Sequence, residues 1–123
     1  MLKKALLGCA LALAATPAFA DFSSCYEPIA PVAVDGATAD EKQMMHAQSD
    51  VKDFIKASDD YQVCLQSQYQ KMKKDAANAK DKKPIDPSIT DDLNSRIGAN
   101  QKLKEKVGAE FNSAVGLYKQ KHP

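Results

Sequence analysis

The segment Lys82-Lys83-Pro84-Ile85-Asp86-Pro87 decides the fold, because it separates two long stretches that both carry a helical pattern. Proline lacks a backbone N–H and clashes with the preceding helical turn, so the two prolines of this segment end a helix. No proline or glycine occurs from Thr38 to Lys80. After the break, Pro87 suits the first turn of a new helix, with Asp86 or Ser88 as its N-cap.

Apolar residues recur close to the helical period on both sides of this break. We expect a first helix over residues 39–81, beginning at a capping box formed by Thr38 and Glu41, and a second helix over residues 87–121. The short connection predicts an antiparallel hairpin of two long helices, an all-α fold. The two apolar stripes comprise Met44, Ala47, Val51, Phe54, Ile55, Tyr61, Leu65, Tyr69, Met72, Ala76 and Ala79, and then Ile89, Leu93, Ile97, Leu103, Val107, Phe111, Ala114 and Tyr118.

The turn also predicts a register for the hairpin. If residue 80 faces residue 88, then Phe54 faces Ala114. Asn100, the one polar residue within the second stripe, then falls opposite Tyr69. An amide and a phenol can hydrogen-bond there, and a single polar layer helps to fix the register of paired helices.

Residues 1–20 show the three parts of a secretory signal peptide. Lys3 and Lys4 form a basic start, residues 5–15 are apolar, and residues 18–20 read Ala-Phe-Ala. We expect cleavage after Ala20 and a soluble, periplasmic mature protein. Cys9 follows too few apolar residues for a lipoprotein signal, and no later apolar run is long enough to cross a membrane.

The mature chain keeps two cysteines, Cys25 and Cys64, which we expect to pair because an exported protein meets an oxidising compartment. There is no Cys-x-x-Cys spacing, which argues against zinc or haem. Residues 21–38 contain prolines and one glycine, so we expect an extended strap. Because Cys64 lies about 37 Å along the first helix, the strap must run back along that helix. We expect it to cover the groove between the helices with Ile29, Val32 and Val34.

Composition argues against several functional classes. The formal net charge of the whole chain is +1, whereas nucleic-acid binders usually show a strong basic excess. The sequence contains no recognisable nucleophile–base set, carboxylate dyad or cofactor-binding loop. We therefore expect a non-enzymatic interaction or scaffold protein without a cofactor.

A metal-handling protein is the alternative, because His46, Asp50 and Asp53 share one side of the first helix. The neighbouring Met44 and Met45 add thioethers, which suit Cu(I). Consecutive helical residues point about 100° apart, however, and an Asp four residues from a His is more often a solvated pair. We favour no metal site.

Two further surfaces are candidates for binding, one for a partner protein or a second copy of the chain and the other for a membrane surface. Small residues gather on one side of the second helix, where another backbone can approach closely. Lysines gather at the hairpin tip, where peripheral contact with anionic lipid is the alternative to simple solubility. The small-residue face comprises Ser95, Gly98, Ala109, Ser113 and Gly116, and the basic tip comprises Lys71, Lys73, Lys74, Lys80, Lys82 and Lys83.

The motifs Cys25-Tyr26-Glu27-Pro28, Asp35-Gly36, Val51-Lys52-Asp53-Phe54-Ile55, Tyr61-Gln62-Val63-Cys64-Leu65 and Asn100-Gln101-Lys102 extend over most of the mature chain. In these motifs the chain resembles a group of small exported proteins of alphaproteobacteria. The resemblance implies no activity. In size and expected location the chain is also similar to periplasmic helical chaperones of the Spy type, although it lacks their repeated Leu-Thr-x-x-Gln motif.

Overall fold

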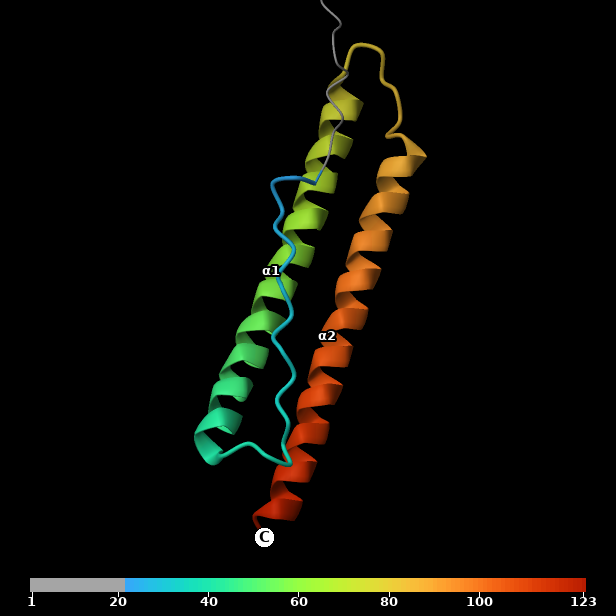
Figure 1. Ribbon diagram of the computed structural model, residues 1–123. Helices are drawn as coiled ribbons and strands as arrows, with labels where there is room; N and C mark the ends of the chain where they lie inside the picture. The colour runs from blue at the N-terminus through green and yellow to red at the C-terminus, as the bar shows by residue number, and fades with distance from the viewer. Residues whose placement is uncertain (1–21) are drawn as a thin grey trace, which may run out of the picture.

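The computed structural model describes residues 22–123. The predicted signal peptide, residues 1–20, lies outside the described residues, as does Cys9. Two antiparallel helices, α1 (Glu41–Asn78) and α2 (Pro87–Lys121), lie side by side, and the strap, residues 22–39, runs along the groove between them (Figure 1). This is the expected all-α hairpin, and all regular secondary structure in residues 22–123 is helical. Neither helix is apolar enough over a sufficient length to cross a membrane.

The first helix begins two residues later than its predicted capping box. Asp40 is the N-cap: its carboxylate accepts from the Gln43 N–H at 2.7 Å, and the Gln43 side chain accepts from the Asp40 N–H at 2.9 Å. The expected box of Thr38 and Glu41 is wrong, because the Thr38 hydroxyl donates instead to the Asp35 carboxylate at 3.1 Å. Asp35 thus closes a turn that ends the strap before the helix starts.

The second helix has the predicted bounds, and Asp86 caps it by accepting from the Ser88 N–H at 2.9 Å. The first helix ends at Asn78 rather than at residue 81. Beyond it the Lys82 N–H donates to the Ala79 carbonyl at 3.0 Å, and Lys82 has a φ of 43°, outside the helical region. The chain therefore turns back before the prolines are reached.

Most of the buried apolar residues form two clusters, and Phe54 and Val107 are buried as well. One cluster contains Phe22, Cys25, Tyr61, Leu65 and Leu93. The other contains Ala39, Met44 and Ala114. In both clusters the strap supplies buried residues, so the core has three layers of chain rather than two helices alone.

A buried polar layer lies between the apolar clusters and corrects the predicted register. The Asn100 side-chain amide donates to Ser58 Oγ at 3.2 Å and accepts from Gln62 Nε2 at 2.9 Å. The pairing of Asn100 with Tyr69 is wrong, since the Tyr69 hydroxyl is 3.0 Å from the Thr90 hydroxyl. The shift has a visible cause: α1 extends beyond the start of α2, and the connection returns along it (Figure 1).

Candidate functional site

The strap is held at its first end by a disulfide and a buried ring. Cys25 and Cys64 form the predicted disulfide, with their Cα atoms 5.7 Å apart. Phe22 is 1% exposed and packs in the cluster that contains Tyr61 and Leu65. Sequence reasoning missed Phe22. The sequence did offer one signal for it, a large aromatic residue three positions before Cys25.

Arg96 closes this end of the strap from α2. Its guanidinium carbon lies 6.0 Å from the centroid of the Phe22 ring, within cation–π range. Its Nε donates to both Asp92 carboxylate oxygens at 3.0 Å. A hydrogen bond to the Tyr61 side chain, followed by the one to Asp92, raises the pKa of Arg96 and favours its charged form.

The second end of the strap is held by a turn that lies directly against α2. The Asp35 carboxylate accepts from the Ala37 N–H at 2.9 Å, and its carbonyl accepts from the Ala39 N–H at 2.9 Å. Gly36 is buried so tightly that a Cβ atom there would stand 1.9 Å from the carbonyl oxygen of Ala114. Only glycine allows this approach of the strap to the helix.

Between its two fixed ends the strap turns apolar side chains toward solvent. Tyr26 is 86% exposed, Ile29 is 93% exposed and Val32 is 95% exposed. The prediction that Ile29 and Val32 fill the groove is therefore wrong. Val34, in contrast, is partly buried and packs against the cluster that contains Ala39, Met44 and Ala114. The prediction failed because Pro28 and Pro31 set the backbone geometry of this segment, and that geometry decides the side to which Ile29 and Val32 point.

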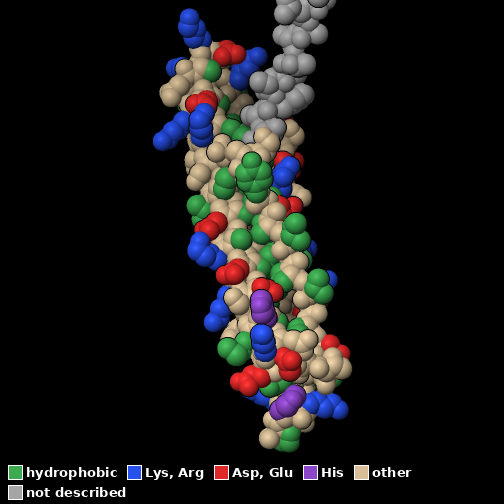
Figure 2. Space-filling view, turned by 60° about the vertical axis from the view of Figure 1, so that its left-hand side comes forward, with side chains coloured by type: hydrophobic (Ala, Val, Ile, Leu, Met, Phe, Trp, Pro, Cys, Tyr) green, Lys and Arg blue, Asp and Glu red, His purple; other side chains and the backbone are tan. Residues whose placement is uncertain are grey.

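The predicted metal candidates do not assemble into a site. His46, Asp50 and Asp53 are exposed and line a shallow hollow on α1, and Met45 lines the same hollow, while Met44 is buried in the core. Within residues 22–123, no three histidine, cysteine or acidic side chains lie close enough to hold a metal ion. The two histidines are separated on the surface (Figure 2), and the His122 ring stacks on Tyr118 at 4.2 Å.

The small-residue face of α2 lies on the outside of the hairpin. A Cβ atom at Gly98 or Gly116 would meet nothing within 4 Å, so this side is open. Ala109 and Ser113 border a shallow hollow beside the end of the strap. The structure thus leaves this face accessible, and nothing in the described residues covers it.

The basic tip is partly neutralised by its own acids. Lys71 pairs with Asp75 at 2.9 Å, and Lys83 lies 3.8 Å from Asp81. Lys73 lies 5.8 Å from the Tyr69 ring centroid. The positive charge of the tip is therefore broken up by carboxylates rather than gathered into one continuous patch.

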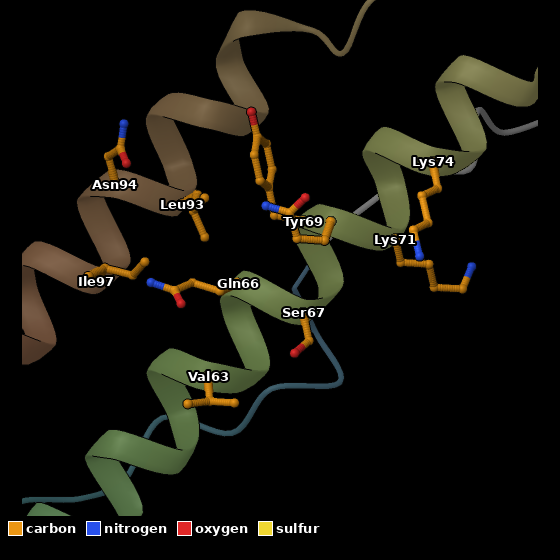
Figure 3. A pocket seen from close by; sticks show the side chains of 10 residues that line it. Val63, Gln66, Ser67, Tyr69, Lys71, Lys74, Leu93, Asn94 and Ile97 are labelled. Carbon is orange, nitrogen blue, oxygen red and sulfur yellow. The ribbon is translucent and has the colours of Figure 1, made fainter.

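A groove on the side of the hairpin away from the strap was not foreseen. Gln66 and Tyr69 from α1 point toward Leu93 and Ile97 from α2 across it, and the strap passes behind (Figure 3). Its volume is about 730 Å³, and Lys71 and Lys74 border it on the outer side of α1. Farther along, the amides of the buried polar layer close the same face.

Comparison with known proteins adds no functional assignment. No protein-family model, curated protein or solved structure matches the chain. The function must therefore be argued from the surfaces that the fold presents.

Proposed function

We propose that this protein is a non-enzymatic interaction or scaffold module of the periplasm that binds another protein. The observation that carries the proposal is the set of large apolar side chains that a rigid, disulfide-tied hairpin leaves in solvent. Contiguous exposed apolar surface usually marks an interaction site on a soluble protein. Tyr26, Ile29 and Val32 follow one another along the strap, and Met45, Val63 and Leu117 are exposed on the helices.

The location in the proposal rests on two supports. The disulfide joining Cys25 and Cys64 is a bond that persists in oxidising compartments such as the periplasm. The residues before Asp21 have the composition of an export signal. Figure 2 shows apolar side chains at the surface among charged ones, which suits a protein that stays in solution until it meets a partner.

A paired capture experiment tests the proposal. A tag placed after Pro123 retrieves the wild-type protein from native cells treated with a short amine cross-linker, and a variant with all six exposed apolar residues changed to serine is the control. Both should fold, since five of these side chains are more than 60% exposed and Leu117, at 43%, is the only one of the six that is less than half exposed. We expect one protein, or a second copy, to be enriched with wild type and not with the variant. Equal recovery from both, with a strict monomer by light scattering, would contradict the proposal.

The metal-handling alternative has its own test. Equilibrium dialysis with copper and with zinc compares the wild type with His46→Ala. Our proposal predicts no stoichiometric binding that depends on His46. Binding of one ion per chain that the substitution abolishes would favour the alternative.

A further inference from the structure

The three large apolar side chains of the strap that are exposed are spaced by three along the chain. Tyr26, Ile29 and Val32 are each more than 85% exposed, whereas Pro28 and Ala30 between them are partly buried against the helices. We call these three side chains the strap ridge. A β-strand would place alternate residues on one face, so Pro28 and Ala30 would share the exposure of Tyr26. The observed spacing is instead that of a polyproline II helix, which has three residues per turn.

The backbone supports the same conformation. Pro28 and Pro31 fix their own φ near the polyproline II value and hold Glu27 and Ala30 in extended conformations. Within residues 22–123, no hydrogen bond joins the backbone of residues 26–34 to another backbone group. A polyproline II helix has no internal hydrogen bonds, so its backbone groups stay available to a partner.

The ridge is organised before any partner arrives. The disulfide at Cys25 fixes one end, and Gly36 seated against Ala114 fixes the other. A free peptide of this sequence would lose conformational entropy on binding, and the fold removes much of that cost.

We propose that the strap ridge is a preformed polyproline II ligand for a different protein, one whose shallow groove is lined by aromatic side chains with a basic rim. Grooves of aromatic side chains accept preformed polyproline II segments. Because Pro28 and Pro31 are partly buried against the helices, the side chains offered to such a groove are those of Tyr26, Ile29 and Val32. The basic rim follows from charge: residues 22–39 carry Glu27 and Asp35 and no lysine or arginine. This inference rests on the proposed function and names its surface and partner class.

A second copy of the chain does not fit this description. The sequence has no tryptophan, and the groove of this chain that Lys71 and Lys74 border contains a single aromatic ring, that of the partly buried Tyr69. Addition of the strap to the edge of a β-sheet is also disfavoured, because Pro28 and Pro31 remove two of the N–H donors that such pairing needs. The chemistry therefore points to a heterologous partner.

Site-specific photo-cross-linking in native cells tests the inference. Benzoylphenylalanine replaces Ile29 or Val32 on the ridge, and Val63 as the matched control, since Val63 is 62% exposed on α1. We expect both ridge positions, but not the control, to give an adduct with one other protein. Mass spectrometry should place the attachment on a partner segment that contains tyrosine, tryptophan or phenylalanine. The purified partner should then bind Ile29→Asp at least tenfold more weakly than Ile29→Leu, with the same unfolding midpoint for both variants.

Each other result counts against the inference. Adducts with a second copy, attachment to a partner segment without aromatic residues, or equal binding of Ile29→Asp and Ile29→Leu would overturn it. Adducts at Val63 but not at the ridge would leave the proposed function standing and remove the ridge from it. No adduct at any of the three positions, together with failed capture, would remove both.

Discussion

The Asn100 side-chain amide donates a hydrogen bond to Ser58 Oγ across the helix pair, and both residues are fully buried. This contact lies between the two apolar clusters, where each shifted register would bury an unpaired amide. A buried asparagine at one position of a heptad-like core is a known device for fixing how helices align. The buried residues of α2 do recur every seventh position, at Leu93, Asn100, Val107 and Ala114.

Replacing Asn100 tests this role. We expect Asn100→Leu to lower the free energy of unfolding by about 1–3 kcal/mol, because the Ser58 hydroxyl loses its partner inside the core. Adding Ser58→Ala should restore part of the loss, since both polar groups are then removed together. Urea titrations of the wild type, the two single variants and the double variant give the coupling. Additive losses would show that the two side chains do not act as a pair.

The contact of Gly36 with Ala114 predicts a sharp difference among glycines. Gly36→Ala places a methyl group within the space of a backbone carbonyl, so we expect a loss of about 1–3 kcal/mol and a loosened strap. Gly98→Ala is the matched control, because its Cβ meets nothing and alanine favours the helix by up to about 1 kcal/mol. Thermal unfolding compares the two. A neutral Gly36→Ala would show that the strap end is not seated against α2.

Much of this fold is predictable because its signals are local. The start of α2 and the disulfide between Cys25 and Cys64 follow from residue types and spacing, whereas α1 ends at Asn78, before the prolines that were expected to end it. The register of the two helices is harder to predict from the sequence, because it depends on how far the connection folds back along α1. A one-residue change in that return shifts every facing pair, and no short motif records it.

The strap shows a second limit. Its extended form follows from Pro28 and Pro31, but which side faces the helices depends on the period of the backbone. We expected apolar side chains to point inward and therefore placed Ile29 and Val32 in the groove. In the structure both side chains point into solvent. The buried apolar side chains of the strap are instead those of Phe22, Cys25 and Ala39. An apolar residue that departs from the burial rule is a candidate for a functional role.

The disulfide should dominate stability. It closes a loop with a sequence separation of 39 residues, and the chain-entropy model gives about 4 kcal/mol for a loop of this length. We expect reduction, or paired Cys25→Ser and Cys64→Ser substitutions, to lower the unfolding free energy by about that amount. Urea titration with and without reductant measures it. Identical midpoints under both conditions would contradict the role given to the bond.

Acid should weaken the start of α2 through Asp86. The backbone N–H of Ser88, and then its side chain, lower the pKa of Asp86 below the usual 3.8. A carboxyl whose pKa is depressed by folding stabilises the protein fully above its unfolded pKa and stops doing so as the pH falls through its folded value. The stability of the wild type should therefore exceed that of Asp86→Asn near neutral pH. The difference should shrink between about pH 4 and pH 2. A difference independent of pH would show that the charge does not matter.

The most direct test of the account measures how rigidly the strap is held. Backbone 15N relaxation with the disulfide intact reports order parameters for Ile29 and Val32, the two ridge residues that are almost fully exposed. We predict values near about 0.85, close to those of α1, because both ends of the strap are fixed. Values below about 0.6 at both residues would mean a flexible loop rather than a preformed ligand, and would contradict the central claim.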